Sequence, residues 1–132
     1  MLVVESERER LLYNEEMLAA LGYEPVGFER PADAIAACRS MPDRFDIILV
    51  SHASQTAVDV AHALHEVAPR QPILLATSST IDVGVDALAE AGISELVRRP
   101  LVSTELAAAL ARCLRSSGTL TVTRLPIAEI LL

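Results

Sequence analysis

Aromatic side chains are scarce in this chain, and their scarcity excludes several kinds of binding site. Of 132 residues, only 3% are aromatic and none is tryptophan. Surfaces that stack nucleic-acid bases and cages that enclose methylated amines both need several aromatic rings. The formal net charge of −7 also disfavours nucleic acid, whose phosphates are bound mainly through lysine and arginine. We therefore expect no nucleic-acid partner.

Cysteines and long apolar runs are scarce as well. The two cysteines, Cys38 and Cys113, fall in helical patterns, and we expect small core residues in a reducing cytoplasm, not a disulfide. No apolar run approaches the roughly 20 residues that span a bilayer, and no signal peptide is visible. The sequence thus predicts a cytoplasmic protein with no membrane partner.

Hydrophobic residues make up 52% of the chain and form short apolar runs that alternate with segments of helical period. The expected strands cover residues 2–4, 25–28, 46–50, 72–76 and 95–98. The expected helices cover residues 6–21, 31–39, 57–67 and 82–91, followed by a last helix capped by Ser103. Nearly continuous apolar strands joined by helices indicate an α/β fold with a parallel, doubly wound sheet covered on both faces.

Residues 116–132 differ from the domain formed by residues 1–115. Residues 116–118 have the composition of a linker, residues 119–123 alternate like a strand, and residues 126–132 are mostly apolar. One interpretation is a frayed tail or the start of a neighbouring segment. The other is an arm that adds to a sheet edge or packs on a second subunit.

Polar residues gather where the expected strands end, which is where ligand sites of parallel sheets lie. They are Glu5, Ser6 and Glu7 after the first strand, Ser51 after the third, Thr77 and Ser78 after the fourth, and Arg99 after the fifth. His62 and His65 lie in the third helix, but no third ligand stands at a spacing suited to zinc.

Several segments, in this order and spacing, resemble the receiver domain of two-component response regulators and hybrid sensor histidine kinases. They are Leu2-Val3-Val4-Glu5-Ser6-Glu7, the run from Pro42 to Leu49, Pro72-Ile73-Leu74-Leu75-Ala76-Thr77, and Arg98-Arg99-Pro100-Leu101. The likeness covers about residues 1–115. It implies a CheY-like, flavodoxin-like (βα)5 fold, with a five-stranded parallel sheet in the order 2-1-3-4-5.

In that family two acidic residues after the first strand and an aspartate ending the third hold Mg²⁺, and the aspartate accepts a phosphoryl group. A lysine and a hydroxyl hold the phosphoryl oxygens. The matching positions here are Glu5, Ser6, Ser51, Arg99 and Thr77, in the order first acid, second acid, acceptor, lysine and hydroxyl.

The resemblance therefore implies a degenerate phosphorylation pocket. Because two carboxylates are missing, we expect Mg²⁺ binding to be weak or lost, with Glu5 as the remaining weak metal candidate, and no cofactor. A serine hydroxyl is a poor nucleophile without a base, and no base is evident beside Ser51. Arg99 could instead pair directly with Glu5. We predict a pseudo-receiver in phosphorelay signalling, with no catalytic residues and no enzymatic activity.

Two other interpretations remain. The chain could be a functional phosphorelay receiver with an atypical acceptor, such as His52, or an atypical metal site. It could also be a small-molecule-binding flavodoxin-like domain, but no glycine-rich phosphate loop follows the first strand.

The expected partner is a histidine kinase or another signalling protein. We also expect a possible homodimer, either through the face of the fourth helix, fifth strand and fifth helix or through the C-terminal arm. That face would carry Val83, Val85, Leu88, Leu96, Leu101 and Leu106. The chain is expected to be either a stand-alone regulator or a segment of a hybrid kinase.

Overall fold

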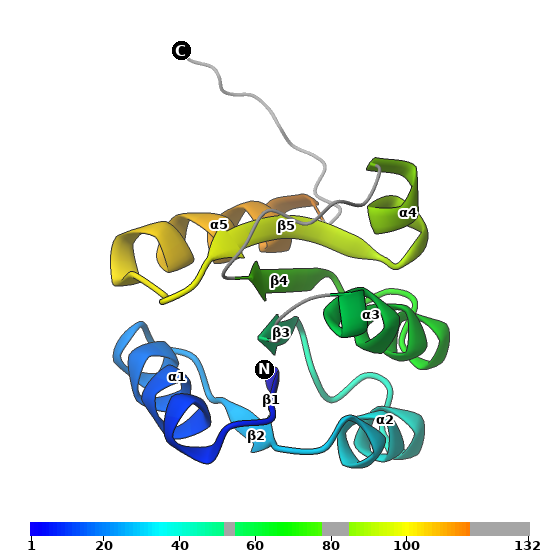
Figure 1. Ribbon diagram of the computed structural model, residues 1–132, viewed down its shortest axis with the longest axis horizontal. Coiled ribbons are helices and arrows are strands. Elements are labelled where there is room, and N and C mark those ends of the chain that lie inside the picture. The colour runs from blue at the N-terminus through cyan, green and yellow to red at the C-terminus, as the bar shows by residue number, and fades with distance from the viewer. Residues whose placement is uncertain (52–54, 78–84, 117–132) are drawn as a thin grey trace.

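Five parallel strands alternate with five helices, as predicted. A computed structural model describes residues 1–51, 55–77 and 85–116. The strands are β1 (Leu2–Glu5), β2 (Val26–Phe28), β3 (Ile48–Ser51), β4 (Ile73–Thr77) and β5 (Ile93–Arg98). The helices are α1 (Arg8–Ala20), α2 (Pro31–Ser40), α3 (Gln55–Val67), α4 (Val85–Glu90) and α5 (Ser103–Ser116). The strand order β2-β1-β3-β4-β5 confirms the predicted (βα)5 topology (Figure 1).

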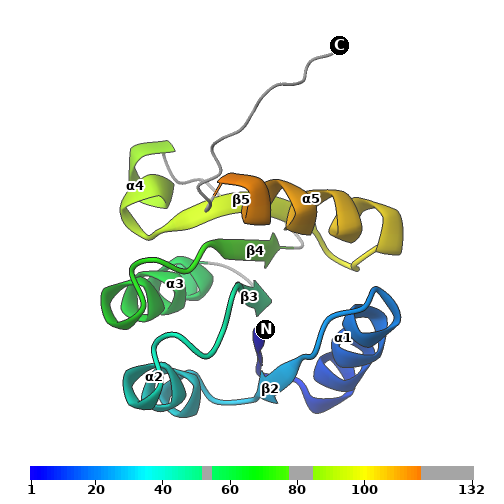
Figure 2. The same ribbon diagram turned by 180° about the vertical axis from the view of Figure 1, so that it is seen from behind.

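The helices form two layers around the sheet, with α1 and α5 on one face and α2, α3 and α4 on the other (Figures 1 and 2). Alternate side chains of the central strands supply a separate core to each layer. Val3, Leu49 and Leu74 pack with the α1 and α5 side, whereas Leu2, Val4, Ile48, Val50, Ile73 and Leu75 pack with the opposite side. The central strands are therefore apolar along their whole length because both of their faces are covered.

Glycine and proline mark several helix boundaries. Gly22 follows α1 with φ +99°, and Gly92 follows α4 with φ +79°, a conformation in which a Cβ atom is unfavourable. Pro31 occupies the first turn of α2, where its missing N–H has no helical acceptor. These three residues stand at the ends of helix ranges predicted from the sequence, which are 6–21, 82–91 and 31–39.

Some predicted boundaries are wrong by one or two residues. Helix α1 begins at Arg8, not at Ser6, because the intervening residues form a bend. Ser103 is the first residue of α5 and not its cap, since the Leu106 N–H already donates to the Val102 carbonyl at 2.8 Å. Asp82, a possible cap at the start of the helix predicted over residues 82–91, and residues 117–132 of the predicted arm lie outside the described residues.

Strands β3 and β5 also differ from their predicted bounds. Strand β3 begins at Ile48, two residues later than predicted, and includes Ser51, which was predicted to follow the strand. Strand β5 begins two residues earlier than predicted, at Ile93. The exposed residues Ser94, Leu96 and Arg98 alternate with less exposed ones along β5, as fits a strand at the sheet edge. That alternation hid the first two residues of β5, Ile93 and Ser94, from a search for continuous apolar runs.

Both cysteines are buried as thiols, which confirms their predicted place in the core. Burial raises the pKa of Cys38, and burial, with a smaller effect from the Glu95 carboxylate, raises the pKa of Cys113 to about 12. Within the described residues, no helix combines the length and the apolar character needed to cross a membrane.

Candidate functional site

The candidate site lies at the carboxyl ends of the central strands. Glu5 ends β1 and pairs in register with Ser51, the last residue of β3. Thr77 ends β4, and Arg99 directly follows β5, its backbone N–H donating to the Thr77 carbonyl at 2.9 Å. The parallel sheet thus brings four of the five predicted pocket residues to one edge.

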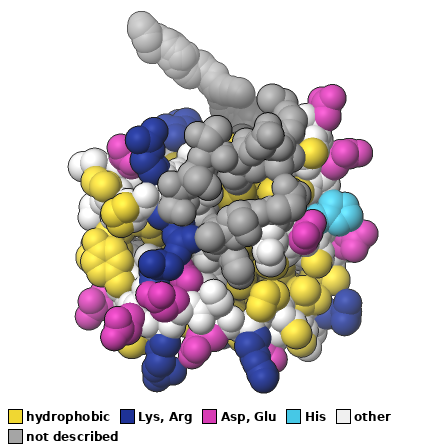
Figure 3. All heavy atoms as spheres, in the orientation of Figure 1, with side chains coloured by type: hydrophobic (Ala, Val, Ile, Leu, Met, Phe, Trp, Pro, Cys, Tyr) yellow, Lys and Arg dark blue, Asp and Glu magenta, His cyan; other side chains and the backbone are white. Residues whose placement is uncertain are grey.

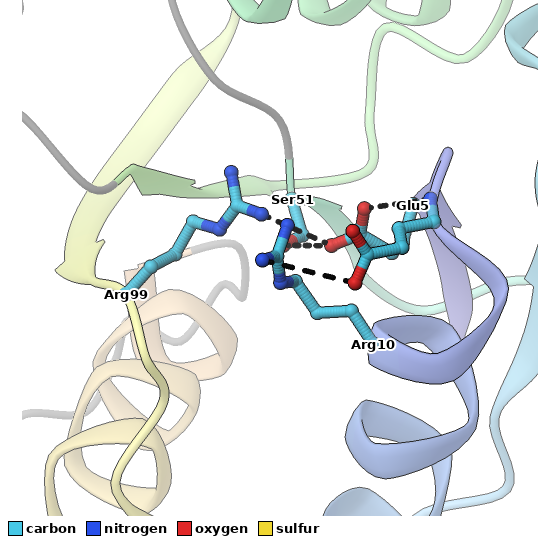
Figure 4. A network of polar contacts seen from close by, with 5 residues as sticks. Glu5, Arg10, Ser51 and Arg99 are labelled. Atoms are coloured by element: carbon cyan, nitrogen blue, oxygen red, sulfur yellow. Dashed lines mark hydrogen bonds and ion pairs between the residues drawn. The ribbon is translucent and has the colours of Figure 1, made fainter.

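Glu5 is the centre of this cluster, and only 1% of it is exposed. The Ser51 hydroxyl donates to Glu5 Oε1 at 2.8 Å, and the Glu7 backbone N–H donates to Glu5 Oε2 at 3.0 Å. Arg99 Nη2 lies 3.5 Å from Glu5 Oε1 (Figure 4). The predicted pairing of Arg99 with Glu5 is therefore confirmed as an ion pair.

Burial makes this ion pair different from the other ion pairs among the described residues. The Arg99 side chain is only 8% exposed, whereas the arginine side chains in the other pairs are 46–80% exposed. A carboxylate in such a position is stable only when charge and hydrogen bonds compensate its lost hydration. Ser51, Arg99 and the Glu7 N–H supply that compensation.

One expectation about Ser51 is wrong. No base was evident beside it in the sequence, yet the structure places the Glu5 carboxylate at hydrogen-bonding distance from its hydroxyl. The two residues are 46 positions apart in the chain, and only the pairing of β1 with β3 joins them. Ser51 is itself 1% exposed, so its hydroxyl faces the carboxylate and not solvent.

Thr77 and Ser6 differ in their surroundings. Thr77 is buried at the end of β4, close to the cluster through its backbone bond with Arg99. Ser6 lies exposed in the bend between β1 and α1. The predicted roles of both residues as remnants of a phosphate and metal site stay predictions.

The residues at this edge do not fit a magnesium ion. Of the three positions that carry carboxylates in receiver domains, only Glu5 does so here. Both of its oxygens already accept hydrogen bonds, and the Arg99 guanidinium lies where a cation would be repelled. Magnesium requires several hard oxygen ligands in near-octahedral geometry. Elsewhere among the described residues, no group of three or more His, Cys, Asp or Glu side chains is placed to hold a metal.

A cavity of about 250 Å³ adjoins this cluster between α1 and the segment that follows β5. Its lining comprises Glu7, Glu9, Arg10, Tyr13, Asn14, Ser51, Arg99, Pro100 and Leu101. Sequence reasoning missed Asn14, which is 2% exposed. A signal was present, because Asn14 interrupts the inward stripe of α1 between Leu11 and Leu18.

Three large hydrophobic side chains of α1 and of the segment after β5 are half exposed, and one of them, Tyr13, lines this cavity. Leu12, Tyr13 and Val102 are each 50% exposed. In Figure 3 hydrophobic atoms gather at the left edge, on the side where α1 and α5 lie in Figure 1. Acidic and basic side chains are otherwise interspersed over the face shown.

The sheet order and the two helical layers define the fold of response-regulator receiver domains, and solved structures support this. The chemotaxis protein CheY4 of Vibrio cholerae is 21% identical with a TM-score of 0.73, covering 85% of this chain and 95% of that one. A receiver domain protein of Clostridium thermocellum is 16% identical with a TM-score of 0.70, covering 87% and 93%.

A protein of Burkholderia pseudomallei named as pilus assembly-related has the same fold. It is 23% identical with a TM-score of 0.73, and the match covers 86% of this chain and 87% of that one. No protein-family model and no curated protein matches the chain. The likeness to these solved structures therefore shows the fold alone.

Proposed function

We propose that this protein is a pseudo-receiver, a receiver-like signalling module that acts through contacts with other proteins and is not phosphorylated at the usual position. The main support for this proposal is that Glu5, Ser51 and Arg99 bond to one another. They do so at the site where receiver domains hold metal and phosphate. Arg99 supplies internally the positive charge that a metal ion would otherwise bring to Glu5. On this proposal the protein works in the cytoplasm, has no enzymatic activity and needs no cofactor.

The proposed partner is a histidine kinase or another signalling protein. The hydrophobic atoms that gather at one edge of the face in Figure 3 support a protein-binding role, because apolar patches at a surface favour association. The interspersed charges of the face shown in Figure 3 and the net charge of −7 give no support to a nucleic-acid partner.

A second candidate function is a phosphorelay receiver in which Ser51 is an atypical acceptor. The hydrogen bond from Ser51 Oγ to the Glu5 carboxylate favours it, since a nucleophilic hydroxyl needs an adjacent base. Two features weigh against it: Ser51 is buried, and Arg99 and the Glu7 N–H also engage the carboxylate. The other candidate acceptor, His52, lies outside the described residues.

The first experiment is a titration with magnesium and beryllofluoride, followed by backbone amide NMR. We expect no saturable shifts of the Ser51 and Thr77 amide signals in the wild type. The reason is that the Glu5 carboxylate alone supplies too few ligands for magnesium. The variant Ser51→Asp restores the acceptor carboxylate, and Ser51→Asn is its uncharged control of nearly equal shape. Saturable shifts in the wild type that require both reagents would contradict the proposal.

A second measurement addresses Ser51 as an acceptor. The wild type and Ser51→Ala are incubated with acetyl phosphate and magnesium and analysed by intact-mass spectrometry. A gain of one phosphoryl group in the wild type, absent from Ser51→Ala, would establish the second candidate. We expect neither protein to change in mass.

A further inference from the structure

The two edges of the sheet differ in length. Strand β2, at one edge, has three residues, whereas β5, at the other, has six. The outer side of an edge strand presents backbone N–H and C=O groups to any strand that comes alongside, and proteins usually keep such edges short or cover them. Among the described strands β5 is the longest, and it pairs with β4 alone. Its outer edge is therefore the place where a further strand can add to the sheet.

The hollow beside this edge limits what kind of strand fits there. It has a volume of about 440 Å³, and its apolar lining comes from Leu88 and Ala89 of α4 and from Ile93 and Leu96 of β5. Leu96 is 45% exposed within the strand. A strand added at this edge alternates its side chains, so every second one points to the α4 side, where the hollow lies. The fitting occupant is thus a strand with apolar residues two positions apart.

Residues 119–123, which lie outside the described residues, have such a sequence. Thr119-Leu120-Thr121-Val122-Thr123 alternates threonine with apolar residues, and both threonine and valine favour strands. These five residues include neither proline nor glycine, which would weaken a strand. In a strand Leu120 and Val122 share one face and the threonines share the other. The chain therefore carries a segment that suits the β5 edge.

The handedness of the fold disfavours adding this segment as a parallel strand to β5 of the same chain. The connections β3–α3–β4 and β4–α4–β5 both step towards the β5 edge, and their helices cover one face of the sheet (Figures 1 and 2). Helix α5 covers the opposite face, where Leu110 belongs to the same core as Leu49 and Leu74. A further outward step through α5 would have the opposite hand, which is rare because parallel crossovers are almost always right-handed.

The length of the connection disfavours the antiparallel arrangement within one chain. Helix α5 runs back along β5, since Arg112 near its end bonds to Glu95 near the start of β5 at 3.0 Å. An antiparallel strand would have to begin beside Arg98, at the other end of β5. That end lies about 17 Å from the first residue of the strand. The chain from residue 116 to residue 119 reaches at most about 11 Å, part of which is used in passing from the helix layer to the sheet.

We propose that two copies of this chain form a symmetric dimer in which residues 119–123 of each copy add a strand to the β5 edge of the other. Neither restriction applies between two molecules, because both concern the connection from β5 to the segment within one chain. Leu120 and Val122 lie over the hollow beside Leu96, and main-chain hydrogen bonds join the strands. The dimer needs neither phosphate nor the cluster around Glu5, so it is independent of the proposed pseudo-receiver function.

Disulfide cross-linking between full-length variants tests the exchange. Leu96→Cys is mixed with Val122→Cys under mild oxidation, and one variant is ¹⁵N-labelled so that intact mass identifies the mixed dimer. Leu120→Cys is tested in parallel, because the strand register decides which of the two residues lies beside Leu96. The native thiols Cys38 and Cys113 are buried and should not compete.

Met41→Cys replaces Leu96→Cys in the control, since Met41 is similarly exposed, at 49% against 45%. We expect the mixed dimer with Leu96→Cys to form at least about tenfold faster than with Met41→Cys, because binding raises the effective concentration of the two thiols. Equal rates with both partners, for Leu120→Cys as well as for Val122→Cys, would overturn the proposal.

The double variant Leu96→Cys/Val122→Cys distinguishes exchange from pairing within one chain. Exchange joins two chains through their disulfides, whereas pairing within a chain closes the disulfide inside a monomer. We expect the covalent dimer as the main product at the concentration used for the mixed reaction. A covalent monomer as the main product would show that the segment pairs with its own β5 and would refute the exchange.

A proline substitution tests the strand pairing without a new thiol. Val122→Pro removes a backbone N–H and does not fit within a paired strand, so it should raise the dimer dissociation constant at least about tenfold in sedimentation equilibrium. Ser117→Pro places proline just after α5, where it is well tolerated, and should dimerise like the wild type. In both variants the amide NMR signals of β1 and β3 should match those of the wild type, which shows a folded domain. An unchanged dissociation constant for Val122→Pro would contradict the proposal.

Discussion

At the scale of single residues, the Glu5 carboxylate joins three segments that are distant in the sequence. It ends β1, receives the Ser51 hydroxyl from β3 and faces the Arg99 guanidinium that follows β5. Each contact compensates part of the free energy lost when the carboxylate leaves water. The cluster therefore acts as a structural link across the sheet, whatever its role in signalling.

We expect Arg99→Leu to destabilise the protein by about 3 kcal/mol, because it leaves the buried Glu5 charge without its cationic partner. Urea denaturation measures this loss. The neighbouring Arg98 is exposed, so Arg98→Leu is the matched control and should change stability by less than about 0.5 kcal/mol. Adding Glu5→Gln to Arg99→Leu should recover part of the loss; equal losses for Arg98→Leu and Arg99→Leu would contradict the linking role.

The sequence was sufficient to predict Glu5, Ser51 and Arg99 as neighbours, because carboxyl ends of parallel strands meet at one edge. It was not sufficient to predict the hydrogen bond between Glu5 and Ser51, which depends on the register of β1 against β3. Asn14 was missed for another reason. Its meaning depends on whether its amide has a partner, and that is a property of the packed structure.

At the scale of elements, two glycines end helices in the same backbone conformation but in different surroundings. Gly22 follows α1, and a Cβ atom there would meet nothing within 4 Å. Gly92 follows α4, and a Cβ atom there would overlap the imidazole of His65 on α3. The second turn therefore depends on both the conformation and the small size of glycine.

We expect Gly22→Ala to cost about 1 kcal/mol, the strain of a left-handed alanine. Gly92→Ala should cost about 3 kcal/mol, because overlap with His65 adds to the same strain. Thermal or urea unfolding measures both. Combining Gly92→Ala with His65→Ala should bring the cost of the glycine substitution close to that of Gly22→Ala, and a cost unchanged by the loss of His65 would show that overlap does not matter.

The strands and helices were predictable to the extent that one pattern dominated each segment. Strands β1, β3 and β4 are buried along their length, and their continuous apolar runs predicted them directly. Strand β5 alternates, so its first two residues were missed. Helix starts were less certain than helix ends, since α1 and α5 begin near several residues able to cap or enter a helix.

At the scale of the whole molecule, the α4–β5 side is the proposed self-association face. A surface hollow of about 440 Å³ lies there, lined by Leu88, Ala89, Ile93, Ser94, Glu95 and Leu96. Leu96 is 45% exposed at the sheet edge, whereas Leu101 and Leu106, predicted for the same face, are buried in the core. Val83 lies outside the described residues. The exposed part of this face is therefore centred on Leu96.

We expect Leu96→Glu to weaken dimer formation, because it places a charge in an apolar contact between two acidic molecules. Sedimentation velocity over a concentration series measures the effect, and the unfolding midpoint should stay close to that of the wild type. Met41, 49% exposed on a distant helix end, provides the control Met41→Glu. A wild type that is monomeric at all concentrations, or equal effects of both variants, would contradict the predicted dimer face.

The division of the core by the sheet has a consequence for how substitutions combine. Cys38 and Ala61 lie in the core beneath α2 and α3, whereas Ala109 and Cys113 lie in the core beneath α5. Side chains on opposite faces share few neighbours, so the energetic effects of substituting them should add. We therefore expect each layer to change its packing with little correlated change in the other.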